Sequence, residues 1–512
     1  MTLVKPAVSS EWVKIGHRIA ALRDERRMTQ QELAKLMGTS QSAIARMEKG
    51  EQNMTAQMLR KVSQALGKEI VVLASSSMNF RIEGGQKLSG TVQTKTSKNA
   101  AVALLCASLL NRGRTRLKEM PRIQEVERII EVLTSIGVST KWLPGNDLEI
   151  IPPRTINITA IDDAAAIKTR SVLMLLGVLI HRFGQFSLPQ PGGCKLGART
   201  VRPHLFALEK FGVHIEAHRG SYSVTARNLA PAEVVLYEQG DTVTENALMA
   251  AACLPGASVI KLASANYMVQ DLCHYLEVLG VKIEGVGTTT LTVHGVADIN
   301  QDVSYAPSED PIETMLFLSI AATTKSSLTI ERCPVDFLEL ELLKMEKMGF
   351  RYKILRRYKG ANGFVNLVDI RTYPSRLVAL EEKLHALPGN VGINIDNLPF
   401  FVPIATQAVG QTLIHDWTYE NRAIYYYELS KLGADIILAD PHRVYIKGPA
   451  KLRGTEVICP PALRPAAIIL IAMLAAEGTS ILRNVYSISR GYEDLAARLR
   501  GLGAKIETLS DF

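Results

Sequence analysis

One pattern recurs six times in this chain and constrains its fold more than any other feature. A stretch with apolar residues at helical spacing ends in a glycine, and alternating apolar and polar residues follow at once. Glycine is favoured just past a helix end because it adopts a left-handed backbone at little cost. The pattern predicts a repeated helix–glycine–strand unit. The six copies are LTSIGVST, LEKFGVHIE, LEVLGVKIE, MEKMGFRYK, LSKLGADII and LRGLGAKIE, with their glycines at Gly137, Gly212, Gly280, Gly349, Gly433 and Gly503.

Very apolar segments lie upstream of these endings. Examples are AVALLCASLL (101–110) and ALMAAACL (247–254), and the longest are SVLMLLGVLI (171–180) and PAAIILIAMLAA (465–476). All are shorter than the roughly 20 residues that a membrane-spanning helix needs. We therefore expect no membrane partner and predict that these segments are helices buried on nearly all sides. Together with the repeats they predict an α/β architecture.

Composition places the chain among ordinary globular proteins. It has 512 residues, of which 47% are hydrophobic and 21% charged, which is typical of soluble domains. Its six cysteines are scattered without a Cys-x-x-Cys pair, which argues against a disulfide framework or a zinc site. Met1 to Gly16 has no apolar signal-peptide segment. We predict a cytoplasmic protein without a metal centre.

Positive charge is concentrated at the start of the chain. The net charge is +9, and residues 1–75 carry 12 Lys and Arg against 7 Asp and Glu. Charge concentrated in this way is typical of a segment with a polyanionic partner, although a solvated surface would look the same.

A helix–turn–helix pattern lies inside this basic segment, in TQQELAKLMGTSQSAIARMEKG (29–50). We expect a first helix that ends at Gly38, and a second that is capped by Thr39 or Ser40 and ends at Gly50. The residues expected to face inward are Leu33, Ala34, Met37, Ile44 and Met47.

Residues 12–73 resemble the Cro/C1 family of DNA-binding domains. In that family the second helix of the motif enters the major groove. The resemblance implies a small all-α DNA-binding domain over residues 1–75, whereas a helical bundle used only for protein contacts is the alternative. It assigns base edges or phosphate to Ser40, Gln41, Ser42, Ala43 and Arg46, of which Ser40 and Arg46 lie nearer phosphate.

The rest of the chain, 78–512, resembles the enolpyruvyl transferases. That family has an inside-out α/β barrel of six repeats in two lobes, with buried helices surrounded by sheets. The resemblance implies one lobe at about 98–307 and a second built from 78–97 plus 308–512. The motifs that carry it are SKNAA (97–101), PGGCKLGAR (191–199), YENR (419–422) and SRGYE (489–493).

The resemblance also implies a reaction. The enolpyruvyl group of phosphoenolpyruvate passes to a hydroxyl of UDP-N-acetylglucosamine or a related sugar nucleotide, and phosphate leaves. This needs cations, an acid and a base, and no metal or cofactor. The family positions match Lys98, Asn99, Arg199 and Arg490 for phosphoenolpyruvate, and Arg170, Arg199, Asp396, Thr418 and Arg422 for the sugar nucleotide. The catalytic positions match Cys194 and Asp396.

Cys194 has two interpretations. A free cysteine in a turn is most often a small apolar residue. In the family, the matching cysteine lies on a mobile loop and is proposed as the general acid. A glycine pair before it would let the loop move over the site, and nearby Arg199 would lower the thiol pKa.

Three positions depart from the family pattern. Ala462 and Arg202 stand where the family has aspartates, and Glu238 stands where it has a lysine that grips the nucleotide. The phosphoenolpyruvate half of the site is thus kept and the uridine half altered. A DNA-binding regulator that senses phosphoenolpyruvate or a cell-wall precursor without turnover is the alternative function. The sequence leaves the oligomeric state open, a homodimer included.

Overall fold

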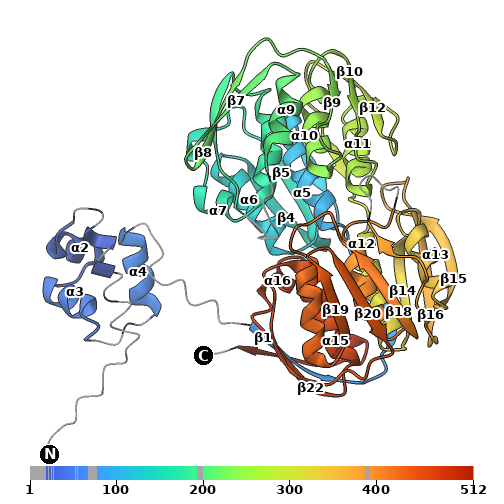
Figure 1. Ribbon diagram of the computed structural model, residues 1–512. Helices are drawn as coiled ribbons and strands as arrows, with labels where there is room; N and C mark the ends of the chain where they lie inside the picture. Colours follow the sequence, from blue (N-terminus) through green and yellow to red (C-terminus); the bar gives the residue numbers. More distant parts are fainter. Residues whose placement is uncertain are drawn as a thin grey trace, which may run out of the picture. The chain divides into compact units, whose positions relative to one another are not determined.

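The computed structural model contains two compact units, Met1–Met78 with Ser510–Phe512, and Asn79–Leu509 (Figure 1). It describes residues 78–192, 200–386 and 392–510. In the first unit it describes residues 28–51 and 56–66, together with Gly16, Ile19, Ala20, Leu22–Asp24, Arg26 and Met54.

The smaller unit contains α2 (Gln30–Met37), α3 (Gln41–Glu48) and α4 (Ala56–Leu66). Gly38 ends α2 with φ at 65°, and the Ser40 hydroxyl accepts a hydrogen bond from the Ala43 amide at the start of α3. The predicted turn is confirmed, and Ser40 is the cap. The core of this unit contains Ile19, Leu22, Leu33, Ala34, Ile44, Met47, Met54, Leu59, Val62 and Leu66, with Met37 partly buried against it.

The predicted repeat is confirmed in the larger unit. All six glycines have φ between 88° and 97°. Each follows a helix: α6 (Gln124–Ser135), α9 (Arg202–Glu209), α11 (Tyr267–Val278), α13 (Glu339–Lys347), the 3₁₀ helix η8 (Ala423–Leu432) and α17 (Leu495–Gly501). Each is followed by a strand at the edge of its own sheet: β4 (Ser139–Leu143), β7 (Val213–His218), β11 (Lys282–Glu284), β15 (Arg351–Lys359), β19 (Asp435–Asp440) and β23 (Lys505–Ser510).

The six sheets fall into two groups of three, and in the described residues no sheet mixes strands of the two groups. The first group adds β3 (Thr115–Leu117), β5 (Asp147–Ile151), β6 (Gln185–Pro189), β8 (Ser221–Ala226), β9 (Glu233–Val235), β10 (Gly256–Lys261), β12 (Thr290–Gly295) and β13 (Val303–Tyr305). The second adds β1 (Met78–Gly84), β2 (Ser89–Gln93), β14 (Ser327–Pro334), β16 (Asn366–Tyr373), β17 (Leu384–His385), β18 (Gly410–His415), β20 (Arg443–Gly448), β21 (Glu456–Ile458) and β22 (Gly478–Arg483). We propose that the groups form lobes over about 98–307 and over 78–97 plus 308–512.

The two ends of the larger unit meet in one sheet, whose order is β21-β22-β1-β23. Phe80 pairs with Leu482 and Gly84 with Gly478 in an antiparallel ladder. The sixth repeat is therefore completed by the strand that begins the unit.

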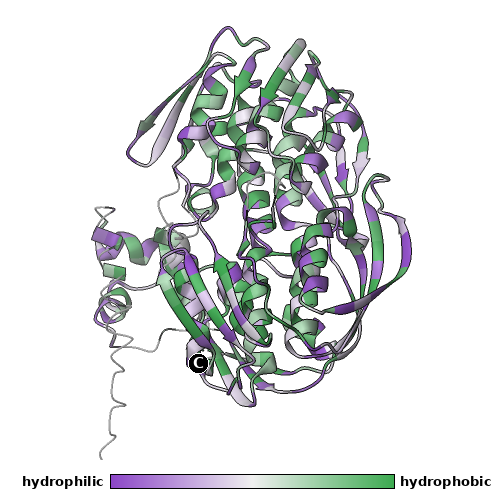
Figure 2. Cartoon of the chain, turned by 45° about the vertical axis from the view of Figure 1, so that its right-hand side comes forward, coloured by the Kyte–Doolittle hydropathy of each residue, from purple (hydrophilic) through white to green (hydrophobic). Residues whose placement is uncertain are grey.

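Apolar helices fill the interior of each group of sheets. They are α5 (Lys98–Ala107), η4 (Arg170–Leu175) with α8 (Leu176–Leu179), α10 (Asp241–Ala252), α12 (Pro311–Thr323), η7 (Leu398–Phe400) with α14 (Phe401–Ala405), and α15 (Leu463–Ala475). Every residue of α12 is buried. Figure 2 shows green on these inner helices and alternating green and purple along the outer strands. In the described residues, no helix is long and apolar enough to cross a membrane.

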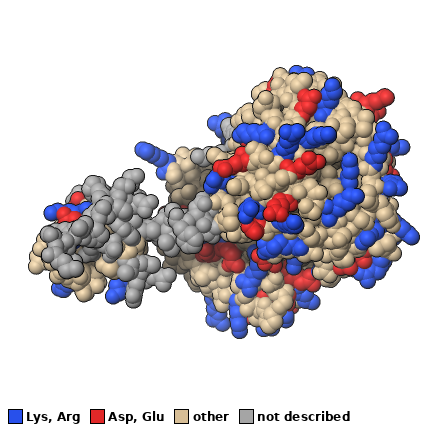
Figure 3. Space-filling model, turned by 90° about the horizontal axis from the view of Figure 1, so that it is seen from below, with Lys and Arg blue, Asp and Glu red and all other residues tan. Residues whose placement is uncertain are grey.

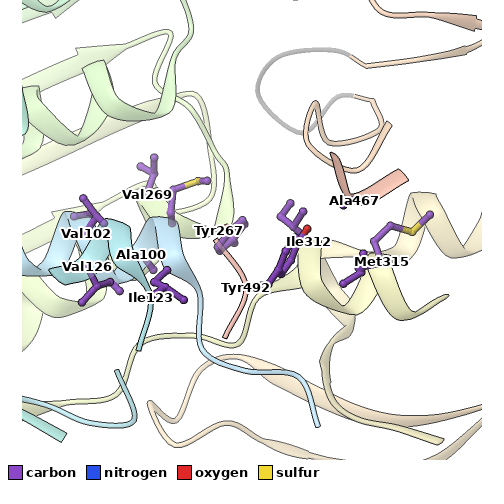
Figure 4. Close-up of a cluster of buried hydrophobic side chains, with 14 of the residues drawn as sticks. Ala100, Val102, Ile123, Val126, Tyr267, Val269, Ile312, Met315, Ala467 and Tyr492 are labelled. Atoms are coloured by element: carbon purple, nitrogen blue, oxygen red, sulfur yellow. The ribbon is translucent and has the colours of Figure 1, made fainter. Parts of the chain in front are cut away.

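Buried side chains from distant elements meet in this interior (Figure 4). Ala100 and Val102 of α5 lie near Val126 of α6, and Ile312 of α12 lies near Tyr492. On the face seen in Figure 3, by contrast, Lys and Arg are interspersed with Asp and Glu over the larger unit. That face is thus mixed in charge, while the core forms one continuous hydrophobic cluster.

The two chain segments that pass between the sheet groups pair with each other. Thr96 and Glu309 form an antiparallel bridge. The Ser97 amide donates to the Ser308 carbonyl oxygen at 2.8 Å, and the Asp310 amide donates to the Lys95 carbonyl oxygen at 2.8 Å. A short double connection therefore joins the two groups at the start of α5 and of α12.

Candidate active site

A cavity of about 210 Å³ lies where the first turns of several inner helices meet. A second opening of about 170 Å³ shares Lys98, Asn99 and Arg490 with it and extends to Arg170 and His204. The polar residues that line the first are Lys98, Asn99, Ser171, Asp241, Thr242, Glu245, Asp396, Tyr419, Arg422, Arg464 and Arg490.

The start of α5 brings Lys98 and Asn99 into this cavity. Ser97 caps the helix, its hydroxyl accepting from the Ala100 amide at 3.2 Å. The following residues of α5 are buried, which fixes the first turn in place. Burial lowers the pKa of the Lys98 ammonium, against the opposing effect of the nearby Glu125 carboxylate. Free amides at a helix start also favour anions.

Asp396 lies between two arginines. Its Oδ2 accepts from Arg464 Nη2 at 3.3 Å, and its Oδ1 is 3.9 Å from Arg422 Nη1. Burial acts to raise the pKa of the Asp396 carboxyl, but Arg464, Arg422 and Lys98 together outweigh it and the pKa is lowered. The group is therefore an ionised carboxylate that lines the cavity.

Arg422 is held in a buried ion pair. Its Nε and Nη2 donate to the two oxygens of Asp416 at 2.6 and 2.7 Å, and both side chains are almost fully buried. The Tyr426 hydroxyl donates to Asp416 at 2.5 Å, and the guanidinium lies 4.4 Å from the centre of the Tyr419 ring. The direction of Arg422 is thus fixed from three sides.

The other two arginines are also oriented by partners. Arg464 Nη1 donates to the Tyr492 hydroxyl at 2.7 Å. Arg490 Nε is 3.4 Å from the Glu125 carboxylate, which accepts from the Thr169 hydroxyl at 2.6 Å. The cavity therefore presents oriented cations around the ionised Asp396, an arrangement suited to a substrate with phosphate and carboxylate groups.

Glu245 is a lining residue that the sequence interpretation did not select. Its Oε1 is buried and has no hydrogen-bond partner among the described residues. Burial raises the pKa of the carboxyl well above its usual value, and Asp241 and Asp271 raise it further. A buried carboxyl oxygen without a partner at the cavity wall is a candidate contact for a bound substrate. Glu245 lies in TVTEN (242–246), a stretch that matches the enolpyruvyl transferases, and this match is the sequence signal that could have identified it.

The predicted site residues are distributed as follows. Lys98, Asn99, Asp396, Arg422 and Arg490 line one cavity, and Arg170 lines its neighbour, where Arg170 Nη2 donates to the Thr200 carbonyl oxygen at 2.8 Å. Thr418 lines neither opening, and its buried Oγ1 has no partner among the described residues. Cys194 and Arg199 lie outside the described residues.

The departures from the family pattern lie away from the cavity centre or at a helix start. Arg202 begins α9 and is exposed, and Glu238 is exposed. Ala462 is buried at the N-cap of α15 and supplies no side-chain hydrogen bond. Arg464, two residues on, was missed as a site residue because nothing in the sequence places it beside Asp396.

In the smaller unit, α3 presents Gln41, Ser42 and Arg46 to solvent, while Ala43 is partly buried. Gln41 Nε2 donates to Gln30 Oε1 at 3.1 Å, and the Ser40 and Ser42 hydroxyls are 3.0 Å apart. The exposed polar face of a second helix is the arrangement that helix-turn-helix domains use in the major groove.

Six repeats around inner helices, with oriented cations where the helices begin, define an enolpyruvyl transferase fold. The family described as EPSP synthase (3-phosphoshikimate 1-carboxyvinyltransferase) matches residues 82–499, and the helix-turn-helix family matches residues 19–73. The chain belongs to the EPSP synthase family of enolpyruvyl transferases and carries an N-terminal helix-turn-helix domain.

Known relatives are similar over most of the chain. It is 34% identical over 441 residues to UDP-N-acetylglucosamine 1-carboxyvinyltransferase of Bradyrhizobium diazoefficiens, covering 85% of this chain and 99% of that protein. The enzyme of the same name from Treponema denticola is 33% identical over 84% of this chain and 98% of its own length.

Two solved structures share the fold. The enolpyruvyl transferase NikO from Streptomyces tendae superposes with a TM-score of 0.71 at 24% identity, covering 85% of this chain and 99% of NikO. EPSP synthase from Acinetobacter baumannii gives a TM-score of 0.67 at 16% identity, covering 85% and 100%. At these identities the likeness shows the fold alone.

Proposed function

We propose that the protein transfers the enolpyruvyl group of phosphoenolpyruvate to the 3-hydroxyl of UDP-N-acetylglucosamine, in peptidoglycan precursor synthesis. The observation that carries the proposal is the ionised Asp396 between Arg464 and Arg422, in one cavity with Lys98 and Arg490. The relatives that match almost end to end are named for this reaction. We assign the protein to the cytoplasm, where sugar nucleotides and DNA are both present.

The proposed roles follow the charges. Lys98 and Arg490, with Arg199, bind the phosphate and carboxylate of phosphoenolpyruvate, and Asn99 orients it. Arg170, Thr418 and Arg422 contact the sugar nucleotide. These contacts hold the acceptor oxygen beside C2, which lowers the entropic cost of reaction.

The proposed addition step forms the bond between the acceptor oxygen and C2 of phosphoenolpyruvate. The acceptor proton passes to Asp396, and C3 takes a proton from the Cys194 thiol. In the elimination step C3 returns a proton to the Cys194 thiolate, and the C2–C3 double bond forms again. The C2–O bond to phosphate breaks, and the leaving phosphate takes the proton that Asp396 had accepted. Cations around the phosphate stabilise the charge that leaves.

Cys194 can be tested against the other five thiols. Burial raises the pKa of Cys253 to about 11 and of Cys459 to about 12, and raises those of Cys106, Cys273 and Cys333 further. We therefore expect iodoacetamide at neutral pH to label Cys194 first, as read by mass spectrometry. Earlier labelling of any other cysteine would leave Cys194 as a small apolar residue in a turn.

The transferase proposal is tested by phosphate release. We expect release only when phosphoenolpyruvate and UDP-N-acetylglucosamine are both present, with a product whose mass contains both. Binding of either ligand without release would instead favour a regulator that senses a precursor. That alternative is supported by the loss of a carboxylate at Ala462 and by the fused helix-turn-helix domain.

We also propose that the smaller unit binds duplex DNA through α3. Affinity should fall steeply with salt, since phosphate contacts release counterions. Arg46→Ala should weaken binding to all sequences alike, whereas Gln41→Ala should change sequence preference. The measurement is a selection of bound genome fragments at low salt, followed by titration of the recovered sequence. If the protein recovers no more DNA than an unrelated protein does, this proposal is wrong.

A further inference from the structure

A cavity of about 220 Å³ lies beside the double connection between the sheet groups, and we call it the lobe-junction cavity. It shares no lining residue with the candidate active site. Its lining residues are Tyr267, Gln270, Asp271, His274, Ser308, Asp336, Phe337, Phe364 and Val365.

One wall of the lobe-junction cavity is a single face of α11. This face begins at Tyr267, and the other three residues follow it by three, four and seven positions: Gln270, Asp271 and His274. Positions with this spacing lie along one side of a helix. They belong to the first group of sheets. The helix therefore supplies two aromatic rings with polar groups between them.

The opposite wall comes from the second group of sheets. Phe337 ends the 3₁₀ helix η5 (Val335–Phe337), and Phe364 lies in the turn between β15 and β16. The Tyr267 and Phe337 rings are 5.9 Å apart, and the His274 and Phe364 rings are 3.6 Å apart, measured between centroids. Two aromatic contacts thus join the walls across the cavity.

The lining is acidic. Asp271 is 1% exposed, accepts from the Ser308 amide at 2.7 Å and accepts from the Tyr305 hydroxyl. Asp336 is exposed and accepts from Asn366 Nδ2 at 2.7 Å. Among the described lining residues there is no lysine or arginine. Aromatic faces beside carboxylates are the chemistry that attracts organic cations.

We propose that the lobe-junction cavity binds a small organic ammonium ion. The aromatic rings cover its apolar stem, and the exposed Asp336 carboxylate attracts its positive charge. Gln270 and Ser308 supply oxygen acceptors for its N–H groups.

The location connects this site to the active cavity. The Ser97 hydroxyl donates to the Tyr267 hydroxyl at 3.0 Å, and the Ser97 amide donates to the Ser308 carbonyl oxygen at 2.8 Å. Ser97 also caps α5 directly before Lys98. An occupant of the lobe-junction cavity would therefore contact two residues that hold the start of α5.

A matched ligand pair tests the proposal on the full chain. Isothermal titration calorimetry would compare 2-phenylethylammonium with 2-phenylethanol, which has the same ring and stem without the charge. We expect saturable binding of the ammonium ion, roughly tenfold or more tighter than the alcohol, from cation–π and carboxylate attraction. Equal affinities, or no saturable heat at millimolar ligand, would overturn the proposal.

Variants locate the binding to this cavity. Asp336→Asn keeps an oxygen for Asn366 but removes the charge, and Phe364→Leu removes an aromatic face. Each should weaken ammonium binding several-fold. The matched controls are Asp298→Asn, another exposed aspartate, and Phe206→Leu, another partly exposed phenylalanine that contacts a ring. If the two cavity variants bind the ammonium ion as tightly as the two control variants do, the ligand binds elsewhere and the proposal fails.

Discussion

The candidate active site and the lobe-junction cavity have nearly equal volumes, about 210 and 220 Å³, but opposite charge. Around the first, Arg422, Arg464 and Arg490 each lie beside a carboxylate. The second has two aspartates and neither lysine nor arginine among its described lining residues. The first is lined from helix ends and loops, whereas the second lies between one side of α11 and residues of the second sheet group.

The two cavities therefore hold their aspartates in different states. Three cations overcome burial and lower the pKa of Asp396, whereas burial raises the pKa of Asp271 to about 7. One carboxyl is an ionised group ready to accept a proton, and the other titrates near neutral pH. Four experiments break or sharpen this contrast.

Asp396→Asn should produce the largest effect. The amide cannot take the acceptor proton, so turnover should fall roughly 100- to 10,000-fold, measured as phosphate release. The control is Asp298→Asn, because Asp298 pairs with Arg112 and neither residue lines either cavity. This variant should turn over normally. Near-normal turnover of Asp396→Asn would remove this residue from the proposed mechanism.

Arg422→Ala should destabilise the fold strongly, because it leaves Asp416 buried without its partner. Breaking a buried ion pair in this way costs about 3–5 kcal/mol, measured by urea unfolding. Arg483→Ala breaks an exposed pair with Glu456, whose partners are 42% and 51% exposed, and should cost about 1 kcal/mol or less. Similar losses for the two variants would contradict the assigned burial of Arg422.

Asp271→Asn should change how stability depends on pH. The pKa of Asp271 is raised from its ordinary 3.8 to about 7, so the folded state binds this proton more tightly than the unfolded state. Stability from this group is therefore lost as pH rises from about 4 to about 7. Wild-type protein should lose more free energy of unfolding than Asp271→Asn over that range. Parallel pH profiles would show that Asp271 does not titrate there.

The hydrogen bond between Ser97 and Tyr267 should give the smallest effect. Ser97→Ala, Tyr267→Phe and the double variant form a thermodynamic cycle, and we expect a coupling free energy of about 0.5–1.5 kcal/mol. Ser97→Ala should also raise the Michaelis constant for phosphoenolpyruvate, since it removes the cap before Lys98. Strict additivity would show that the two cavities are not linked through this contact.

Local features of this chain were predictable from the sequence. The six glycines all adopt a left-handed backbone. This conformation was predictable because it depends only on the helix that ends before each glycine and the strand that follows it. Ser40 caps α3 through a hydrogen bond from the amide of Ala43, only three residues further along the chain. The inner helices were predictable because their residues are apolar on every side.

The assembly of the site was less predictable. Lys98 and Arg490 were selected from motifs, but Arg464 and Glu245 were not, although both line the same cavity. The role of Arg464 depends on Asp396, which lies far away in the sequence. Beyond burial, the pKa of Glu245 depends on Asp271 of α11 as well as on Asp241 of its own helix. The lobe-junction cavity had no sequence signal, because its two walls come from separate sheet groups.

The sequence by itself determined the repeat and the helix-turn-helix, since periodicity and capping act over a few neighbours. Only the tertiary structure decided which charges meet. Arg422 lies beside both Asp416 and Asp396, and Lys98 at the start of α5 shares a cavity with Arg490 at the end of a short helix over Tyr486–Ser489. Electrostatic energy depends on distance in space and on burial, and neither quantity is set by separation along the chain.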